Sequence, residues 1–324
     1  MKRFLSILLT LCVSIVLFAE TFLSATAARS TDDYSLYEIQ TIVDDFLSDN
    51  NYNITTNSPE FFEFTKNQLL GENPDKRLIN HDKFDLIHSY LVEYYVEICD
   101  NLLLNEEKKD IAGYSSENTN YVISNSSLDK TLKEIKEDNI SKMESNKGIR
   151  TIASYSFSRS AAASYARQYA ISYNPIYKSY WPTDCRNFVS QCLHAGGLPM
   201  HGSTQAGVEE STTEWYHYYS GETASGSVVS VTTSFIRVVD LVSYLSNKTT
   251  VQNCTTVSQL YNACSTGDAF FLADATTLTP YHAMIISNAN SSSTTYCGHT
   301  NDRKDSYVRN IPLDGDIFIL CHFN

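Results

Sequence analysis

The stretch YWPTDCRNFVSQCLHAGGLPM, residues 180–200, decides the fold of the second half of this 324-residue chain. Pro182 breaks the chain, and the apolar spacing after it predicts a helix that begins at Asp184 or Cys185. A Gly-Gly pair that starts at Gly196 ends this helix. Cys185 is therefore expected in the first turn of a short helix.

A cysteine in the first turn of a helix is well placed to act as a nucleophile. Unpaired backbone N–H groups and the positive end of the helix dipole favour the thiolate over the thiol there. The same N–H groups can stabilise an oxyanion. Cys192 lies two turns further along and is expected to be a buried core residue. Taken alone, Cys185 would also suit a structural role, so its chemistry depends on a partner.

Two histidines in the last third of the chain are candidates for that partner. HAMIIS, residues 282–287, and TTYCGHT, residues 294–300, read as the arms of a β-hairpin joined by a Ser- and Asn-rich turn. Antiparallel pairing brings His282, which begins the first arm, and His299, near the end of the second, to the same end of the sheet. Together with a cysteine at a helix start, they favour a cysteine hydrolase over two structural histidines.

His282 is the predicted general base, and such a base needs a group that fixes its tautomer. His299, Asn301 and Asp302 could each accept a hydrogen bond from its second ring nitrogen. His299 is preferred, because side chains alternate along a strand and Asp302 would need an added turn. Asn301 stays open as an alternative. The predicted catalytic residues are therefore Cys185, His282 and His299.

Other clusters in the second half carry weaker signals. Three glutamates lie close together in the sequence: Glu209, Glu210 and Glu214. No histidine or cysteine stands at ligand spacing from them, so we expect a solvated acidic loop and no metal site. The aromatic residues that follow could either stack on a sugar or peptide or cover the core; they are Trp215, Tyr216, Tyr218 and Tyr219.

The first half differs from the second in charge. Residues 31–148 hold 24 acidic against 11 basic side chains, whereas residues 149–324 hold 12 against 10. Neither half has the clustered lysine and arginine that phosphate binding requires, so a nucleic-acid partner is not expected. Residues 35–47 and 84–104 repeat apolar residues at helical spacing. We therefore expect a mostly helical, acidic accessory region.

Two further features of this region are expected at the surface. Residues 127–148 are charged on nearly every turn, which predicts a solvated helix or a linker. His81 and His88 could share a helix face, but without a carboxylate or cysteine at ligand spacing they are expected to be surface residues.

The chain opens with two cationic side chains and an unbroken apolar stretch, followed by small residues. This order predicts a signal peptide over residues 1–28 with cleavage near Ala27, although the same stretch could anchor the chain in a membrane. No second apolar stretch of spanning length follows, so the mature protein is expected to be soluble, without a membrane anchor. Cleavage leaves seven of the eight cysteines. Cys254 and Cys264 are the closest candidates for a disulfide, and buried free thiols are the alternative.

Five features carry a resemblance to a known family: the segment YARQYAISYNPIYKSYWPTDCRNFVSQCLHAGGLPM, Trp215, GDAFF, HAMIIS and HTNDR. With these features the chain resembles an amidase-domain family of exported Gram-positive bacterial proteins. That family is a branch of the papain-like superfamily near the NlpC-type and CHAP peptidases. The resemblance runs from about Tyr155 to the C-terminus. It implies a papain-like fold, with Cys185 as nucleophile, His282 as base and His299 as the third polar residue.

Three residues depart from the family pattern. Arg186 stands where a small residue is expected, and Pro280 and Tyr281 precede the base. Arg186 adds a cation that favours the thiolate and would suit an anionic substrate. Tyr281 could narrow the mouth of the site.

The chain is thus expected to have three parts: the signal peptide, the accessory region over residues 29–148, and an α+β papain-like domain over residues 149–324, with helices against an antiparallel sheet. The predicted reaction is amide hydrolysis through an acyl-enzyme, without a cofactor. Peptidoglycan or peptides are the expected substrates of a monomeric protein that is secreted or cell-wall associated. The rival hypothesis is a catalytically inactive module that binds wall fragments or a partner on the same fold.

Overall fold

The computed structural model describes residues 29–112, 121–145, 155–180, 182–202, 207–223, 226–290 and 293–323. The predicted signal peptide, residues 1–28, and the predicted boundary at residues 148–149 lie outside the described residues. Within the described ranges, no helix combines the length and the apolar character needed to cross a membrane.

The described part of the first half is helical, as predicted. Its elements are η1 (Thr31–Asp33), α2 (Leu36–Asp49), α3 (Pro59–Leu70), α4 (Lys76–Ile79), α5 (Phe84–Ala112), α6 (Asn125–Leu128) and α7 (Leu132–Ser145). Ser35 and Glu38 form a capping box at the start of α2. Ser58 caps α3, whose first residue is Pro59. Local sequence signals therefore determine where these two helices begin.

The second half combines helices with two sheets. Its helices are α8 (Arg159–Tyr169), α9 (Cys185–Ala195), α10 (Thr233–Ile236), α11 (Val238–Ser246), α12 (Val257–Ala263) and η2 (Val308–Asn310). Its strands are β1 (Gly207–Glu209), β2 (His217–Thr223), β3 (Gly226–Thr232), β4 (Thr250–Cys254), β5 (Ala269–Asp274), β6 (Pro280–Asn288), β7 (Thr295–Gly298), β8 (Arg303–Tyr307) and β9 (Asp316–His322). The larger sheet has the order β4-β9-β5-β6-β7-β8 and is antiparallel throughout. The smaller has the order β1-β3-β2, with β1 and β3 parallel. The predicted α+β class is confirmed.

The predicted hairpin forms as β6 and β7. Ile285 pairs with Cys297, and Ile286 pairs with Tyr296. Because side chains alternate across a strand, these two pairs point to opposite faces of the sheet. Ile285 and Cys297 join a hydrophobic cluster with α8, α9 and α11, whereas Ile286 and Tyr296 join one with the first half. Both faces of β6 and β7 are therefore buried.

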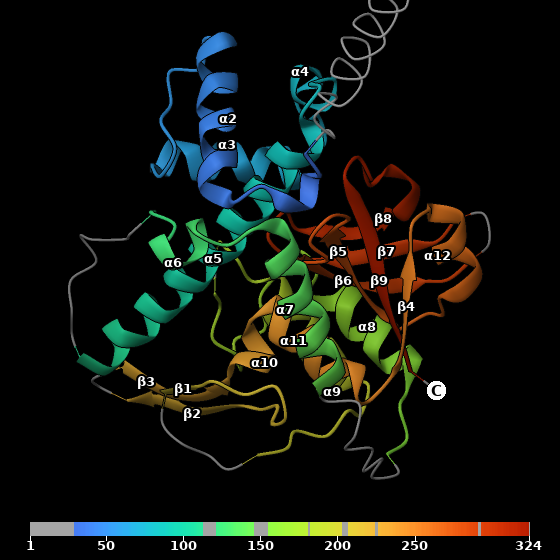
Figure 1. The fold of residues 1–324 in the computed structure, drawn as a ribbon. Helices are drawn as coiled ribbons and strands as arrows, with labels where there is room; N and C mark the ends of the chain where they lie inside the picture. Colours follow the sequence, from blue (N-terminus) through green and yellow to red (C-terminus); the bar gives the residue numbers. More distant parts are fainter. Residues whose placement is uncertain are drawn as a thin grey trace, which may run out of the picture.

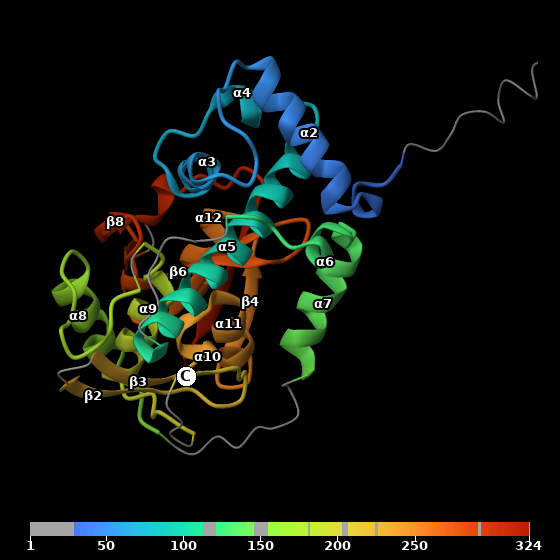
Figure 2. The same cartoon turned by 90° about the vertical axis from the view of Figure 1, so that its left-hand side faces the viewer.

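Helices cover both faces of the six-stranded sheet (Figures 1 and 2). The face toward the first half buries side chains that share one core with α2, α3 and α5; from the sheet these are Phe270, Leu272, Met284, Ile286, Phe318 and Leu320. The predicted accessory region is thus a layer of the same core.

The long helix α5 connects the two halves. It packs against α2 and α3, against β5 and β6 of the larger sheet, and against β1 and β3 of the smaller one. Figure 1 shows it running from the cluster of α2, α3 and α4 to the small sheet. α5 therefore contacts both sheets of the second half, and α7 adds a separate contact with α11.

Two predictions about the surface of the first half are wrong. His88 is only 6% exposed and lies on α5 with its Nε2 2.9 Å from Asp316 Oδ1. The charged segment over residues 127–148 contains α7, which packs on α11 and buries Leu132 and Ile135. His88 contacts Gly315 and Asp316 of the second half, whereas Leu132 and Ile135 join the core that the first half shares with one face of the larger sheet. Local sequence patterns do not reveal packing between such distant segments.

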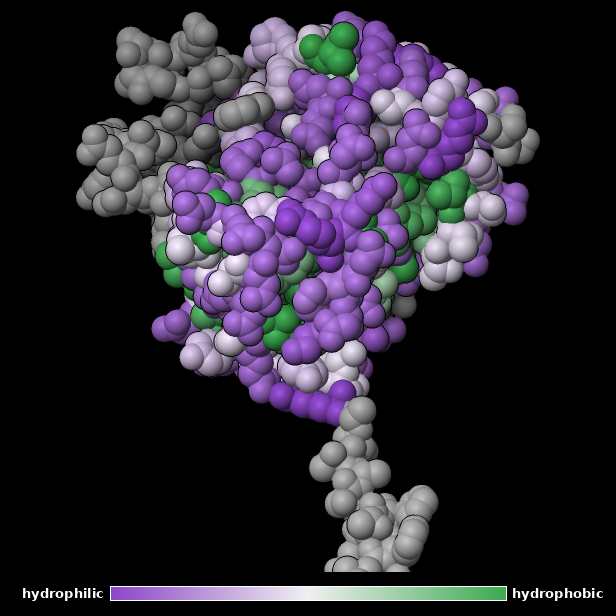
Figure 3. Space-filling view, turned by 90° about the horizontal axis from the view of Figure 1, so that it is seen from above, coloured by the Kyte–Doolittle hydropathy of each residue, from purple (hydrophilic) through white to green (hydrophobic). Residues whose placement is uncertain are grey.

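The outer surface of the first half is polar. Seen from above, the molecule is mostly hydrophilic, with hydrophobic residues in small separate groups (Figure 3). The apolar side chains of α2 point inward instead and are almost fully buried; they include Leu36, Ile39, Val43 and Phe46. The apolar sides of these helices are therefore directed into the shared core.

All seven cysteines of the described residues are free thiols, and only Cys264 is partly exposed. The disulfide considered between Cys254 and Cys264 is not formed. The alternative, buried free cysteines, describes the structure.

Candidate active site

Cys185 opens α9, as the sequence predicts. Asp184 is the N-cap residue, and Gly196 follows the last helical residue. The first N–H groups of a helix have no acceptor within the helix, and the helix dipole is positive at this end. Because α9 packs against β6, the thiol lies where the helix N-terminus meets the strand that carries His282.

The Cys185 thiol interacts directly with His282. Burial, the largest effect, raises the pKa of Cys185, but the charge and hydrogen bond of His282 act in the opposite direction. Arg186 and the backbone N–H of Ala283 add to this, and together they lower the pKa of Cys185 to about 6. A cysteine with such a pKa is mostly thiolate at neutral pH, which is the nucleophilic form.

His282 lies on the side of the sheet that is turned toward the first half. It lines a cavity of about 340 Å³ with Asn301, Arg303 and residues 69–73. Its Nδ1 is buried and has no hydrogen-bond partner among the described residues. Asn301 shares the cavity, and its amide nitrogen donates a hydrogen bond to the backbone carbonyl of Leu70 at 2.6 Å.

His299 does not hydrogen bond to His282, contrary to the expectation that it orients the base. Its Nδ1 lies 2.6 Å from Asp184 Oδ2, and its Nε2 lies 2.8 Å from the backbone oxygen of Tyr169. Both contacts are on the α9 side of the sheet. The two imidazoles do lie at the same end of the sheet. His299, however, lies on the face of the sheet that points away from the cavity lined by His282. A catalytic part for His299 stays a prediction, and it cannot be direct orientation of the base in this arrangement.

The third candidate, Asp302, is also engaged elsewhere. It lies in the turn after β7 with φ of 32° and hydrogen bonds with the hydroxyl of Tyr173. Of the three candidates named from the sequence, only Asn301 shares a cavity with His282. Asn301 makes no hydrogen bond to His282 Nδ1, so its orienting role stays a prediction.

Arg186 and Tyr281 do not act as the sequence suggested. The Arg186 guanidinium is 2% exposed and donates to the backbone carbonyl of Ile236 and to the hydroxyl of Thr183, so it is not placed to bind an anionic substrate. Its charge does favour the thiolate of Cys185. The Tyr281 hydroxyl donates to Asp316 Oδ2 at 2.6 Å in the interior, so this ring does not narrow the mouth of the site.

The first half contributes side chains next to the nucleophile. Tyr95, Cys99 and Leu103 lie four residues apart and thus on one side of α5. The charge of Cys185 acts on the pKa values of Tyr95 and Cys99, and Leu103 belongs to the same hydrophobic cluster as Cys185. Burial, the largest effect, raises the pKa of Cys99 to about 12, so Cys99 is not a competing nucleophile. Cys185 itself is 1% exposed, so the thiol is buried beside this side of α5.

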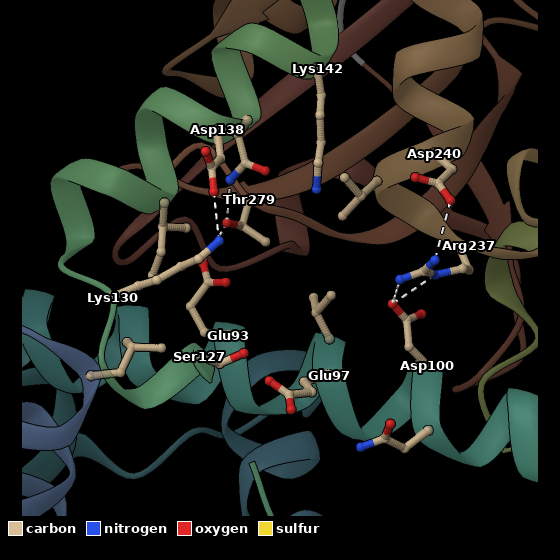
Figure 4. A pocket seen from close by; sticks show the side chains of 16 residues that line it. Glu93, Glu97, Asp100, Ser127, Lys130, Asp138, Lys142, Arg237, Asp240 and Thr279 are labelled. Carbon is tan, nitrogen blue, oxygen red and sulfur yellow. Dashed lines mark hydrogen bonds and ion pairs between the residues drawn. The ribbon is translucent and has the colours of Figure 1, made fainter. Parts of the chain in front are cut away.

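A second cavity, of about 310 Å³, separates α5 from α7 and α11. Figure 4 shows Glu93, Glu97 and Asp100 along α5, opposite Lys142 of α7. The Glu93 carboxylate accepts from the hydroxyls of Thr277 and Thr279 in the loop before β6; burial, the largest effect, raises its pKa to about 7. This network ties α5 to the strand that carries His282.

An ion pair also holds α5 against the start of α11 in the second half. Arg237 donates from Nε and Nη2 to Asp100 Oδ2 at 2.8 and 2.5 Å (Figure 4). Among the residues that the structure describes, no group of three or more histidine, cysteine or acidic side chains is placed to hold a metal ion.

Part of the aromatic cluster near residue 215 is core. Trp215 and Tyr216 are fully buried, Tyr218 is exposed, and the side chain of Tyr219 lies outside the described part of the structure. Sequence reasoning missed Asp184 and the α5 residues near the thiol. Asp184 had a local signal, because an acidic residue directly before a helix is a usual N-cap. The α5 residues had none, because their position depends on packing between distant segments.

Among known proteins, the chain is similar to one described family and to part of one bacterial protein. The family described as "Putative amidase domain" matches residues 156–321, just over half of the chain. That range contains Cys185, His282 and His299. The uncharacterized protein YhbB of Bacillus subtilis (strain 168) is 43% identical over 53 residues, or 16% of this chain. The match spans only 17% of the length of YhbB. No solved structure matches the chain.

The family segment spans both parts of the candidate site. The matched range starts just before α8 and ends within β9, so it includes both the helix that carries the cysteine and the strand that carries the histidine. Hydrolysis of an amide bond is the activity that the family description implies. The chain therefore belongs to the amidase-domain family.

Proposed function

We propose that this protein is a secreted, cysteine-dependent amidase or peptidase with a papain-like catalytic domain. One observation carries the proposal: the Cys185 thiol, at the N-terminus of α9, contacts His282 and has its pKa lowered to about 6. A thiolate beside an imidazole is the arrangement that nucleophilic acyl transfer requires. Membership in the amidase-domain family adds that the acyl group is held in an amide.

The reaction would proceed in two steps. Cys185 attacks the amide carbonyl, and His282 protonates the leaving amine, so that an acyl-enzyme forms. Water, deprotonated by His282, then attacks the thioester and releases the acid and the free thiol. The unpaired N–H groups in the first turn of α9 would stabilise the oxyanion in both steps.

The proposed location and substrate follow from the start of the chain. The predicted signal peptide indicates export, and the expected relatives are exported proteins of Gram-positive bacteria. Peptidoglycan is the abundant amide-rich polymer outside such cells. The proposed scissile bond is therefore an amide of the stem peptide, or the bond that joins this peptide to the glycan.

The test is a panel of wall fragments and peptides incubated with the mature protein, with product masses as the readout. Mature wild type should release an acid and an amine from at least one amide of the panel, and Cys185→Ser should release none. Cys192→Ser is the matched control, because Cys192 lies on the same helix and is fully buried. Equal loss in both variants, with the fold retained, would refute Cys185 as nucleophile.

A second candidate function has one observation in its favour. Cys185 is 1% exposed, which would suit a binding module that has lost turnover. A thiolate-selective reagent separates the two. Rapid alkylation of Cys185 near pH 7, without hydrolysis of any panel member, would indicate a closed enzyme, whereas a thiol that reacts only in unfolded protein would indicate the binding module.

A further inference from the structure

His299 is held between two oxygen atoms that act as hydrogen-bond acceptors. Its Nδ1 lies 2.6 Å from Asp184 Oδ2, and its Nε2 lies 2.8 Å from the carbonyl oxygen of Tyr169. A neutral imidazole has one N–H and would direct a lone pair at one of these oxygens. A proton must therefore lie in each of the two contacts.

The partner of this imidazole is the residue directly before the nucleophile. Asp184 Oδ1 accepts a hydrogen bond from the Tyr180 N–H at 2.8 Å and another from Asn187 Nδ2 at 2.9 Å. Hydrogen bonds donated to a carboxylate stabilise its charged form. The shared proton is therefore assigned to His299, and the contact is a carboxylate–imidazolium pair.

Asp184 occupies an N-cap position without capping the helix. Its side chain makes no hydrogen bond to the backbone of the first turn of α9. An aspartate at this position usually accepts from one of the first N–H groups of the helix. Here the carboxylate is turned toward His299 instead. The N–H groups beside Cys185 therefore stay available for a substrate oxyanion.

The pair is buried and packed from several sides. Asp184 is 1% exposed and His299 is 2% exposed. The imidazole stacks on the ring of Phe188, with centroids 4.0 Å apart and planes at 22°. Phe188 lies one turn after Cys185 on α9. The end of α8, the start of α9 and the turn after β7 thus meet at one ion pair.

We propose that Asp184 is a positioning residue. With the imidazolium of His299 it forms a buried ion pair that fixes the first turn of α9, and with it the Cys185 thiol, against the strand that carries His282. This inference rests on the proposed function, because it assigns to Asp184 and His299 the alignment of that nucleophile and base. It also replaces the role predicted for His299: the histidine acts through Asp184 and not on His282.

The groups around His299 support its positive charge. Burial, the largest effect, lowers the pKa of His299, but the hydrogen bond and charge of Asp184 outweigh it and the net pKa is raised. The Tyr169 carbonyl and the carboxylate of Asp302 act in the same direction, and the ring of Tyr173 packs against the imidazole. Because the folded pKa is raised, the pair is complete at acidic pH and is lost as the pH rises through that pKa.

The first measurement is made on the wild-type protein, and a substitution serves only to assign the signal. Mature wild-type protein labelled with 15N-histidine is observed by NMR as a function of pH, and His299→Gln assigns the resonance. Two N–H protons on His299 at pH 6, with a titration above that of a free histidine, are expected. A His299 ring that carries a single N–H proton at pH 6 would overturn the proposal, whatever the enzyme assays show.

The second measurement follows the thiol. The rate of Cys185 alkylation by iodoacetamide is measured against pH in wild type, Asp184→Asn, His299→Gln and the double variant. The matched control is His322→Gln, because His322 also pairs with a buried aspartate, Asp268, at 2.8 Å, but at the other end of the sheet.

Both single variants should shift the alkylation midpoint upward, toward the value of about 8.5 for a free thiol. Where turnover is measurable, kcat should fall by about a hundredfold with little change in KM, as expected when a reacting group is misplaced. The double variant should recover part of the loss, because an Asn–Gln pair leaves no buried charge alone. The His322→Gln control should keep the wild-type midpoint.

The outcomes separate this inference from the proposed function. An unchanged midpoint in a folded Asp184→Asn variant would refute the positioning role alone. A wild-type Cys185 that alkylates only as an ordinary thiol would refute the proposed nucleophile, and with it the positioning role. If a single variant fails to fold, the NMR result on wild type and the double variant still decide the matter.

Discussion

The burial of Cys185 beside α5 predicts that access to the thiol depends on the contacts that hold this helix. Asp100→Asn removes one charge of the Asp100–Arg237 pair, whose side chains are 16% and 25% exposed. Hydrogen bonds to charged groups contribute about 1.5–3 kcal/mol. Glu210 and Asp240 lie 3.8 and 3.5 Å from the same guanidinium and would partly compensate the loss. We therefore expect the substitution to lower the free energy that holds α5 in place by about 1–2 kcal/mol.

If the thiol is reached only when α5 is displaced, this loss raises the displaced population directly. A tenfold change in an equilibrium constant corresponds to about 1.4 kcal/mol. The alkylation rate of Cys185 should therefore rise about five- to thirtyfold. The assay is mass spectrometry of Cys185 peptides after timed iodoacetamide exposure. The pH is kept above the midpoint of the thiol, so that a change in ionisation does not contribute.

Asp138→Asn is the matched control. It breaks an ion pair of 2.6 Å with Lys130 that lies within the first half, and both side chains are about half exposed. Its alkylation rate should stay within about twofold of wild type, because exposed pairs contribute little. If Asp100→Asn lowers the free energy of unfolding but leaves the alkylation rate unchanged, the thiol is reached by a route that does not displace α5, and the reasoning is wrong.

Three further predictions concern the site and the boundary between the halves. Cys185→Ala should abolish hydrolysis, and a Cys192→Ala variant that keeps its fold should retain it; activity surviving the first change would exclude the assigned nucleophile. His282→Ala should lower kcat by several orders of magnitude, and the double variant with Cys185→Ala should be no worse than either single one, since the pair acts as a unit; additive losses would place His282 in another step. Burial, the largest effect, lowers the pKa of His88, but the Asp316 contact outweighs it and the net pKa is raised. Wild type should therefore lose stability relative to His88→Gln as the pH rises from about 6.5 through that raised pKa; denaturant unfolding at several pH values measures this, and parallel curves would contradict it.

Local patterns were sufficient for the elements that hold the nucleophile and base. The start of α9 at Cys185 and the hairpin of β6 and β7 could both be read from proline, glycine and alternating apolar residues. The hydrogen-bond partner of His299 could not be predicted from local patterns. It depends on which face of the sheet meets α9, and that choice is made by the packing of the whole layer. The same holds for His88, whose partner Asp316 is 228 residues away in sequence.

The apolar face that the larger sheet turns toward α2, α3 and α5 has a practical consequence for handling this protein. A recombinant fragment limited to the family segment, residues 156–321, would leave that face uncovered. The side chains exposed in this way include Phe270, Leu272, Met284, Ile286, Phe318 and Leu320. Exposed apolar surface of this kind drives aggregation. Such a fragment should collect in inclusion bodies, whereas the chain from residue 29 onward should stay in solution.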